Sequence, residues 1–391
     1  MSYNNRRRFS RNNNGGKRTI KAFDPRKLIH NTNLITSSTD DKVEEPQINS
    51  SFSDFYLKPE VKSAIKYRNY NVPTPIQDQS IPTILEGKDV VGIANTGTGK
   101  TAAFLIPLIN KVLSNNQSKI LIVAPTRELA VQIDEEFRQF TKKLRLYSTV
   151  CIGGVNIRRQ INDLSRNPHF VIGTPGRLLD LSNQKKLYLS NYDSVVLDEV
   201  DRMLDMGFIH DIKKIISQLP SDRQSLFFSA TLDSRTKSVM NDFLKNPVII
   251  TSQSTQTKLD IAQEAIELNG RDKNTLLQEI LDEKDVVKAI IFVRTKHGVD
   301  KLSRMLSKNG FKTTVMHGSK SQNHRQRSLN DFREGVVDTL IATDVAARGI
   351  DINDITHVIN YDLPETQEDY IHRIGRTGRS GKKGSAISFV N

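Results

Sequence analysis

Short apolar runs alternate with longer amphipathic stretches from about Phe52 onward. In the first half of the chain these runs are Asp89–Ile93, Ile120–Ala124, Phe170–Gly173, Ser194–Leu197 and Leu226–Ser229. Short, nearly continuous apolar runs are typical of strands buried on both faces, and the stretches between them are long enough to hold covering helices. The pattern therefore predicts an α/β fold with a mostly parallel sheet flanked by helices.

A second set of strand-like runs follows a polar stretch. Asn246-Pro247 leads into the polar segment Gln253–Lys258, a combination typical of a linker. Apolar runs resume at Ala289–Val293, Thr313–Met316, Thr339–Thr343 and His357–Asn360. Because 391 residues also exceed what one core usually supports, we predict two domains, 51–253 and 261–391, joined by a linker at 254–260.

Residues 1–50 have a different composition. Their cations, Arg6-Arg7-Arg8, Arg11, Lys17-Arg18 and Lys21, stand among asparagines and glycines with few large apolar side chains. Such a segment cannot offset its chain entropy by burial, so we predict a disordered basic tail. Two roles stay open for it, namely non-specific contact with a nucleic-acid backbone and solubility alone.

Bulk properties narrow the function classes. The net charge of +13 favours a separate polyanionic partner such as a nucleic acid. Cys151 is the single cysteine, which rules out an intrachain disulfide and favours a reducing, cytoplasmic setting. We expect its thiol to be a small buried group rather than a nucleophile. The chain has no apolar run of about 18 residues and no apolar signal core, so we expect neither a membrane span nor secretion.

The run Ser194–Leu197 ends in Asp198-Glu199-Val200-Asp201. An apolar strand that stops at acids places them at the carboxyl edge of a sheet, where open α/β folds bind ligands. Three neighbouring carboxylates repel one another and are costly to bury unless a cation or donors compensate them. Taken alone, the tetrad could also be a solvated acidic turn.

A glycine-rich turn further upstream favours the ligand site. The strand-like Asp89–Ile93 precedes Ala94-Asn95-Thr96-Gly97-Thr98-Gly99-Lys100-Thr101, and a helix-like stretch follows. This is the context of a Walker A loop, in which backbone N–H groups and a helix N-terminus face phosphate oxygens. We expect Lys100 to reach the phosphates of a nucleoside triphosphate and Thr101 to ligate Mg²⁺. Asp198 would hold the metal and Glu199 would polarise the attacking water. One departure is Ala94 in place of the usual first glycine.

With these two features the chain resembles the DEAD-box family of ATP-dependent RNA helicases, of the bacterial type, within helicase superfamily 2. The resemblance covers roughly residues 52–391, and the motifs follow the family's order. It implies two tandem RecA-like domains with ATP in the cleft and RNA bound across both. Val200 stands where the family has alanine, a change that should be tolerated because the flanking acids do the chemistry.

The resemblance also implies how ATP is bound. Asn69–Gln77 resembles the family's Q motif, with Gln77 reading adenine, Tyr70 stacking on the base and Phe52 as the upstream aromatic. The family usually has Gly-Phe where this chain has Asn69-Tyr70. The other cofactor contacts implied are Thr96, Gly97, Thr98, Gly99, Lys100, Thr101 and Asp351.

Further motifs resemble the family's RNA contacts, which position a strand by its backbone without reading its sequence. In the first domain the residues are Thr126, Arg127, Gly153, Gly154, Thr174 and Arg177. In the second domain they are Arg294, Gly318, Thr343 and Gly349, and Gln322 and Arg325 look like further RNA-side residues. Singly, each of the first-domain motifs could instead be a helix cap or a turn, and Glu128 could be a helix-surface acid.

Two motifs connect the domains in the family. Ser229-Ala230-Thr231 resembles its coupling motif, whose hydroxyls can bond to Asp198 and Asp201; a helix N-cap is the alternative, and both can hold. His372 belongs to the same coupling set. In His372–Arg379, Arg376 and Arg379 resemble arginine fingers that reach the γ-phosphate, and if the stretch is helical they share a face. An exposed basic helix is the alternative.

The function implied is RNA-stimulated ATP hydrolysis, coupled to domain closure and to local unwinding of short RNA duplexes or remodelling of RNA–protein complexes, by a monomer. An ATP-gated RNA clamp and a DNA-directed superfamily 2 helicase are the alternatives. The chain ends directly after the strand-like Ser385–Val390, whereas the family usually continues with at least one more helix. We therefore expect a second domain that is short at its C-terminus.

Overall fold

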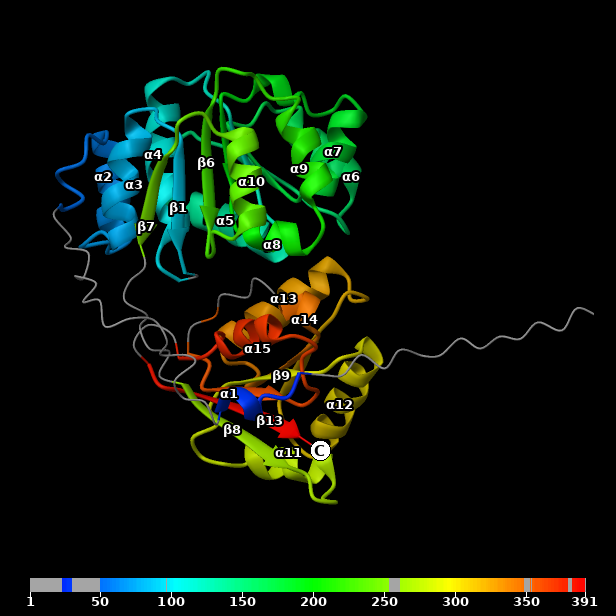
Figure 1. Cartoon of the computed structure of the whole chain (residues 1–391). Coiled ribbons are helices and arrows are strands. Elements are labelled where there is room, and N and C mark those ends of the chain that lie inside the picture. Colours follow the sequence, from blue (N-terminus) through cyan, green and yellow to red (C-terminus); the bar gives the residue numbers. More distant parts are fainter. Residues whose placement is uncertain are drawn as a thin grey trace, which may run out of the picture.

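The computed structural model describes residues 23–29, 50–95, 97–252, 261–347, 352, 354–378 and 382–390. They form two parallel-sheet domains, which lie one above the other in Figure 1. Domain 1 runs from residue 50 to residue 252, and domain 2 begins at residue 261. The predicted fold class is confirmed. Within the described ranges, no helix is long and apolar enough to cross a bilayer.

Domain 1 is built on a seven-stranded parallel sheet with the order β3-β4-β2-β5-β6-β1-β7. The strands are β1 (Val90–Ala94), β2 (Ile120–Val123), β3 (Ser148–Cys151), β4 (Phe170–Gly173), β5 (Ser194–Leu197), β6 (Gln224–Ser229) and β7 (Val248–Ser252). The helices are α2 (Pro59–Tyr67), α3 (Pro75–Leu85), α4 (Lys100–Ser114), α5 (Arg127–Thr141), α6 (Ile157–Leu164), α7 (Pro175–Asn183), α8 (Val200–Asp205), α9 (Ile209–Ile216) and α10 (Ser234–Phe243), with a short 3₁₀ turn at Leu189–Asn191.

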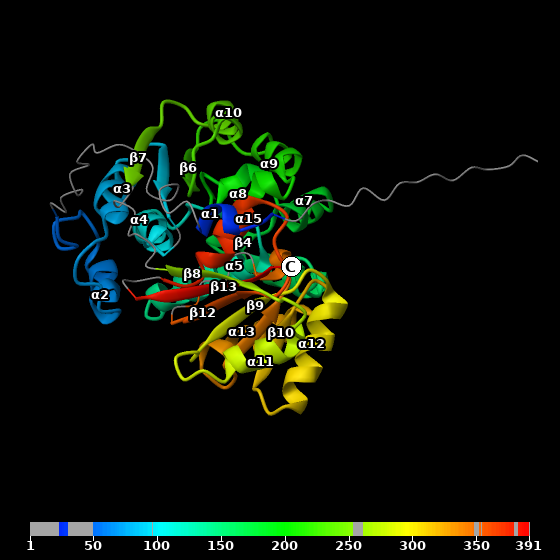
Figure 2. The same cartoon turned by 60° about the horizontal axis from the view of Figure 1, so that its bottom comes forward.

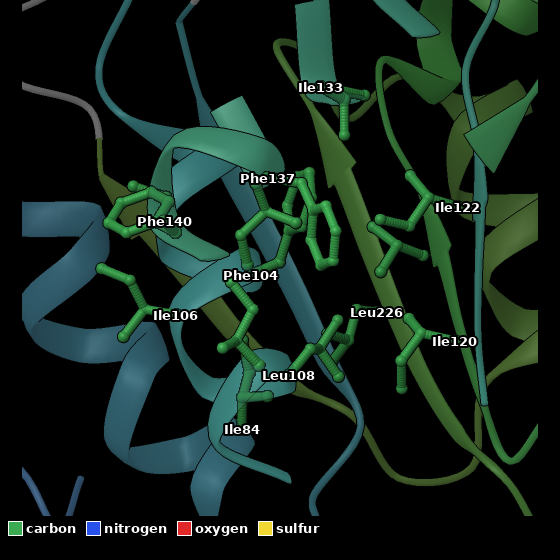
Figure 3. Packing of buried hydrophobic residues seen from close by; sticks show 14 of the residues in the cluster. Ile84, Phe104, Ile106, Leu108, Ile120, Ile122, Ile133, Phe137, Phe140 and Leu226 are labelled. Atoms are coloured by element: carbon green, nitrogen blue, oxygen red, sulfur yellow. The ribbon is translucent and has the colours of Figure 1, made fainter. Parts of the chain in front are cut away.

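Successive residues of the strands point to two separate cores. Ile120 and Ile122 pack with Phe104 of α4 and Phe137 of α5 on one face, as Figure 3 shows. Leu121 and Val123 point to the other face, where they join side chains of α7, α9 and α10. Since both faces are covered, the strands have no polar face, which explains why they are continuous apolar runs in the sequence.

Domain 2 repeats this plan with a six-stranded parallel sheet in the order β10-β11-β9-β12-β13-β8. Its strands are β8 (Ile261–Glu267), β9 (Ala289–Phe292), β10 (Thr313–Met316), β11 (Thr339–Ala342), β12 (His357–Asn360) and β13 (Gly384–Val390). Its helices are α11 (Lys273–Leu281), α12 (Lys296–Lys308), α13 (Gln322–Arg333), α14 (Asp344–Ala347) and α15 (Gln367–Ile374). The cores of α11 with α12 and of α13 with α14 lie on opposite faces of the sheet.

Three strands were not predicted from the sequence, and all three are at the edges of their sheets. They are β3 and β7 of domain 1 and β8 of domain 2. Their side chains are only half-buried or alternate between buried and exposed. In β3 and β8 polar residues interrupt the apolar signal, whereas β7 begins with the apolar run Val248-Ile249-Ile250, which the polar residues after it led us to group with the linker. The stretch from Asn246 that was expected to lead into the linker therefore contributes β7 to the domain 1 sheet.

The prediction that residues 1–50 form a disordered tail is wrong for one segment. Residues 23–29 are placed on domain 2 and include the short helix α1 (Arg26–Ile29). Contacts with domain 2 supply the burial that composition alone could not reveal. The rest of that region up to residue 49, and the linker at 254–260, lie outside the described residues.

Because neighbouring strands are parallel, their carboxyl ends meet at one edge of each sheet. At this edge of domain 1 lie the segments that follow β1, β2, β4, β5 and β6, which contain most of the motifs identified in the sequence. Only Asp198 and Glu199 separate β5 from helix α8. Helix α8 lies on the side of domain 1 that faces domain 2 (Figure 1).

Candidate functional site

The glycine-rich loop after β1 has the backbone that a phosphate loop requires. Gly97 and Gly99 have positive φ angles of 84° and 89°, which are accessible to glycine at little cost. Gly99 directly precedes α4, so the first N–H groups of a 15-residue helix open onto the loop. The buried Lys100 ammonium group donates to the Ala94 carbonyl at 2.8 Å, across the loop. The loop therefore holds a cation where a phosphate anion would bind.

Gln77 joins the helix α3 to this loop. Its Oε1 accepts from the Thr74 backbone N–H at 3.0 Å, and its Nε2 donates to the Gly99 carbonyl at 3.0 Å. A Cβ on Gly99 would lie 2.3 Å from Gln77 Nε2, so this contact requires glycine there. Both ends of the Gln77 amide thus bond to protein groups in this structure, and its role toward adenine stays a prediction.

Of the two aromatic side chains assigned to adenine, Phe52 lies in the core of domain 1 and Tyr70 is half-buried against that core. Tyr70 packs against Phe52 and Phe140 with ring centroids 6.1 Å and 5.7 Å away, and the Arg68 guanidinium lies 5.2 Å from its ring. Phe52 is only 6% exposed. The sequence did not reveal this packing, because the partner Phe140 lies in α5, far along the chain from the loop that holds Tyr70. Stacking of Tyr70 on a base stays a prediction.

Asp198 and Glu199 are both buried, with 2% and 8% exposure, but their environments differ. Burial raises the pKa of Asp198 to about 7, although Lys100 opposes the shift. Burial also acts to raise the pKa of Glu199, but Arg202, Lys100 and Arg376 outweigh it, so that pKa is lowered. Arg202 Nη1 lies 2.5 Å from Glu199 Oε2. Glu199 is therefore held ionised, and Asp198 is a buried acid whose charge is less fully compensated.

Backbone geometry sets the orientation of this acidic pair. Glu199 has a left-handed conformation with φ 52° and ψ 55°, which is uncommon for a side chain of this kind. It directly precedes α8, and its N–H donates to Asp198 Oδ1 at 3.0 Å. The left-handed residue turns the chain sharply from β5 into α8, so both carboxylates stay at the end of the strand.

The third acid, Asp201, binds the segment that follows β6. Its Oδ2 accepts from the Ala230 and Thr231 N–H groups, each at 3.0 Å, and from the Thr231 hydroxyl at 3.1 Å. The Ser229 hydroxyl accepts from the Asp201 N–H at 3.4 Å. The expected hydroxyl bond to the Asp201 carboxylate is present for Thr231, whereas Ser229 bonds to the Asp201 backbone, and the Asp198 carboxylate accepts from the Glu199 N–H.

Arg127 explains the two glycines that follow β3. A Cβ added to Gly154 would lie 2.3 Å from Arg127 Nη1, and one on Gly153 would lie 3.2 Å from Nη2. Gly154 also has a positive φ of 76°. The guanidinium therefore lies against bare backbone at the carboxyl edge of the sheet, where cations and exposed N–H groups can contact a phosphodiester chain.

The other residues assigned to RNA in domain 1 are at helix starts. The Thr126 hydroxyl caps α5 by accepting from the Leu129 N–H at 3.2 Å, so the alternative of a helix cap applies to it. Thr174 directly precedes α7, and Arg177, one turn later, donates to the Val155 carbonyl at 3.3 Å. These positions share one sheet edge with Arg127, and their contact with RNA stays a prediction.

Glu128 is the residue whose role the sequence left most open, and it connects the two domains. Arg325 Nη2 lies 3.0 Å from Glu128 Oε2, and Gln322 Nε2 donates to Glu128 Oε1 at 3.1 Å. The Glu128 and Arg325 side chains are 5% and 10% exposed. Glu128 is therefore not a helix-surface acid, and Gln322 and Arg325 bind domain 1 directly. Because Glu128 and Gln322 are 194 residues apart in the sequence, no local sequence pattern could predict this contact.

In domain 2, α15 ends at Ile374. Arg376 therefore lies beyond the helix, and the shared helical face that a helical stretch would have given it does not form. Arg376 follows in a turn, where its Nε donates to the His372 carbonyl at 3.1 Å, and its side chain is 7% exposed. The preceding Arg373 forms two bonds of 2.5 and 2.7 Å to Asp344 and is also buried. The sequence did not reveal this ion pair, which fastens α15 to the start of α14.

The remaining predicted residues of domain 2 occupy loops. Arg294 is exposed after β9, and its N–H donates to Asp362 at 2.9 Å. Gly318 is exposed after β10, and Thr343 lies between β11 and α14. Thr96, Gly349, Asp351 and Arg379 lie outside the described residues.

The residues assigned to Mg²⁺ suit that ion. Magnesium is usually held by one or two carboxylates together with substrate phosphate oxygens and water, and rarely by an all-protein cage. Asp198 is a buried carboxylate with a raised pKa, and a divalent cation would supply the charge that it lacks. Among the described residues, no three His, Cys, Asp or Glu side chains gather as a metal cage.

Comparisons with known proteins identify both domains. Residues 74–239 match the family model described as DEAD/DEAH box helicase, and residues 272–381 match the helicase conserved C-terminal domain. The ATP-dependent RNA helicase CshA of Listeria monocytogenes is 44% identical over 343 residues, which is 87% of this chain and 66% of that protein. The chain thus spans about two thirds of the length of this relative.

Two solved structures differ in how closely they superpose on this chain. Dbp5 of S. cerevisiae bound to RNA and ADP BeF3 has a TM-score of 0.78 at 34% identity, covering 87% of this chain and 89% of that one. A DEAD box protein from Methanococcus jannaschii has a TM-score of 0.51 at 39% identity, covering 87% and 93%. The Methanococcus protein is more similar to this chain in sequence than Dbp5 is, yet it superposes less well. The lower TM-score therefore reflects a different three-dimensional arrangement and not a more distant sequence.

Proposed function

The chain belongs to the DEAD-box family of ATP-dependent RNA helicases, and we propose that it couples RNA-stimulated ATP hydrolysis to domain closure and local unwinding of short RNA duplexes. The observation that carries the proposal is the composition of the site across two domains. Lys100, Asp198 and Glu199 come from domain 1. Arg376 comes from domain 2, and its positive charge helps to lower the pKa of Glu199. Hydrolysis therefore depends on the domains being together.

The contact between Glu128 and Arg325 supports this dependence on closure. It is buried, and it exists only when α5 of domain 1 and α13 of domain 2 are adjacent. The arrangement superposes better on the RNA- and nucleotide-bound Dbp5 than on the Methanococcus protein. We infer that this chain adopts the same arrangement when ATP and RNA both bridge the domains, which makes the two ligands mutually stabilising.

In this proposal each residue of the nucleotide site has a separate task. Lys100 leaves the Ala94 carbonyl and binds the phosphates, while the turn at Gly97 and Gly99 presents backbone N–H groups to them. Glu199, held ionised by its cationic neighbours, orients the attacking water and accepts its proton. Arg376 stabilises the negative charge that develops on the transferred phosphoryl group.

Thr101 and Asp198 would hold Mg²⁺, which supplies charge neutralisation for the phosphates when bound. Asp201, in α8, links this site to the Ser229–Thr231 segment at the end of β6. Because Asp201 follows Asp198 and Glu199 closely in the chain, a shift of either acid toward ligands would be transmitted through α8 to that segment. We propose this as the route by which nucleotide binding affects the RNA side.

We further propose that RNA binds through its backbone without sequence recognition. Arg127, Gly153 and Gly154 present a cation and bare backbone at the same sheet edge as Thr174 and Arg177, which suits phosphate and sugar contacts. The net charge of +13 favours the same polyanion. A cytoplasmic location and a monomeric state are part of this proposal, on the grounds of the single cysteine and of a site completed within one chain.

The proposal is tested by ATP turnover with and without single-stranded RNA. Wild-type protein is expected to be stimulated by RNA, and Glu199→Gln, which keeps shape but removes the ionised acid, is expected to be inactive in both conditions. Glu86→Gln is the matched control, because Glu86 is a 57%-exposed acid that pairs with the surface Lys88. Unchanged turnover in Glu199→Gln would overturn the catalytic assignment.

Strand displacement separates unwinding from clamping. With a short RNA duplex and ATP, a helicase releases the displaced strand, whereas a clamp stays bound without displacing it. Equal stimulation of ATP turnover by DNA would instead favour a DNA-directed helicase. We expect displacement of RNA and weaker stimulation by DNA.

A further inference from the structure

A short segment of the N-terminal region lies on domain 2, far in sequence from its partners. Residues 23–29 are separated from the first residue of domain 1 by residues 30–49. Figures 1 and 2 both show α1 (Arg26–Ile29) beside β8 and α15, on domain 2 rather than on domain 1. The family models begin at residue 74, so this segment is not part of what they describe.

The segment makes both apolar and polar contacts there. The Phe23 ring lies 5.8 Å from the Tyr370 ring of α15 and packs on the cluster of Tyr370, Ile374 and Ala386. The Phe23 N–H donates to the Pro364 carbonyl at 2.9 Å, in the loop before α15. Arg26 Nη1 lies 2.9 Å from Glu267 Oε1, on the edge strand β8. The three contacts reach a loop, a helix and a strand.

The local structure of the segment depends on these contacts. A helix of four residues is too short to be stable alone, because the cost of its nucleation is not recovered. Asp24 supports the turn by accepting from the Arg26 N–H at 3.0 Å, and it also binds the Arg26 side chain. These bonds pre-form the turn, but burial of Phe23 against domain 2 supplies the apolar contact that keeps it in place.

We propose that Phe23–Ile29 is an intramolecular docking segment, and that the surface formed by Pro364, Tyr370 and Glu267 is its binding site. Docking then positions α15 relative to the sheet. Tyr370 is fully buried and its hydroxyl donates to Gln263 of β8 at 2.9 Å, so Phe23 covers the point where α15 meets the edge strand.

The consequence for activity rests on the proposed function. Helix α15 ends two residues before Arg376, whose Nε is bonded to the last turn of that helix at His372. An undocked segment would leave Tyr370 partly open to water and allow α15 to move, and Arg376 would move with it. Phe23 is therefore a positioning residue, which acts on the reaction only through α15.

Docking also fixes where the basic tail is attached. Residues 1–22 contain seven Lys or Arg residues and no Asp or Glu. Because Phe23 is bound to domain 2, this charge is tethered to domain 2 and not only to the start of domain 1. Two truncations separate the tail from the docking segment: removal of residues 1–22 keeps the segment, and removal of residues 1–29 deletes it.

Hydrogen exchange on the full chain tests docking without reference to catalysis. In Phe23→Ala, amide exchange in α15 and β8 is expected to be about tenfold faster than in wild type, because opening of that edge becomes easier. Phe9→Ala, in the same tail, is the matched control and should leave exchange unchanged. Exchange in domain 1 should be the same in all variants, which shows that the chain is folded.

ATP turnover then tests the positioning of Arg376. Phe23→Ala and removal of residues 1–29 are expected to lower the RNA-stimulated kcat several-fold with KM for ATP unchanged, because Arg376 acts in the transition state. Removal of residues 1–22 should affect RNA affinity but leave exchange in α15 as in wild type. Equal exchange of α15 and β8 in Phe23→Ala and in wild type would overturn the docking site. Faster exchange with unchanged kcat would overturn the positioning role alone, and an inactive wild type would instead refute the proposed function.

Discussion

The buried contact of Glu128 with Arg325 and Gln322 is the strongest test of the idea that closure completes the site. We consider Glu128→Ala, which leaves the Arg325 guanidinium facing an apolar methyl group. Both charged side chains are at most 10% exposed, so solvent screens this pair little. Removing one partner of a buried ion pair costs about 3–5 kcal/mol, because the other charge is left uncompensated.

This cost falls on the closed arrangement only. When the domains separate, Arg325 regains water, so the penalty shifts the equilibrium between open and closed forms rather than unfolding either domain. We take the lower figure, about 3 kcal/mol, which corresponds to a roughly hundredfold decrease in the closed population. At subsaturating RNA, the RNA-stimulated ATP turnover should fall by a similar factor, whereas each domain should melt as in wild type.

Fluorescence transfer between the domains measures the closed population directly. Cys151 is buried, and burial raises the pKa of its thiol to about 12, so it will not compete for labels with introduced surface cysteines. Tyr188→Cys in domain 1 and Val287→Cys in domain 2 are suitable positions, since both side chains are well exposed. ATP and RNA should give high transfer in wild type and much less in Glu128→Ala.

A double-mutant cycle and a second ion pair in the same interface provide the controls. Arg325→Ala should cost about as much as Glu128→Ala, and the double variant should cost clearly less than the sum. Glu135 and Arg333 also connect the domains, but at 3.7 Å and with 40% and 43% exposure, so Glu135→Ala should cost under about 1 kcal/mol. If Glu128→Ala closes and turns over ATP like wild type, the buried pair does not drive closure and the reasoning is wrong.

Three further outcomes follow from the site. Gly154→Ala should destabilise domain 1 by about 1–2 kcal/mol in urea unfolding, because its φ is positive, and should weaken RNA binding, because the added Cβ, 2.3 Å from Arg127 Nη1, would displace the guanidinium; an unchanged unfolding midpoint would contradict the backbone strain. Asp201→Asn should retain ATP binding but lose RNA-stimulated turnover, since Asn has one acceptor oxygen and cannot accept both from Ala230 and Thr231, as Asp201 Oδ2 does, and from the Arg202 N–H, as Oδ1 does; full RNA stimulation would exclude the coupling role. Folding raises the pKa of Asp198 from 3.8 to about 7, so the protein loses stability as pH rises from about 4 to about 7, where only the unfolded state has released this proton, and the loss is complete above pH 7. Asp198→Asn should therefore be more stable than wild type at pH 8, by at most about 4 kcal/mol, and this gain should shrink toward pH 5.5 in Mg²⁺-free urea titrations; a gain independent of pH would show that Asp198 does not titrate there.

The amino-acid sequence by itself determined the central strands and the chemistry at their ends. Ile120–Val123 and Ser194–Leu197 were identifiable because a strand buried on both faces must be apolar throughout. Gly99, Lys100 and the acids at 198 and 199 were identifiable because phosphate and metal sites require particular residue types within one short turn. These features are local, so a local pattern carries them.

Tertiary structure alone decided what depends on distant residues. Edge strands such as β8 were not predicted because one side of the strand is unpaired and its apolar signal is weak. Arg376 would lie on a helical face only if its stretch were helical, but α15 ends at Ile374, and the ion pair of Arg373 with Asp344 became visible only in the fold. Glu128 was ambiguous until Arg325 was placed against it, and Phe23 was assigned to a disordered tail until domain 2 covered its ring. A side chain's own neighbours in sequence do not reveal which charge or apolar surface packing will bring to it, and that is why these contacts became visible only in the folded chain.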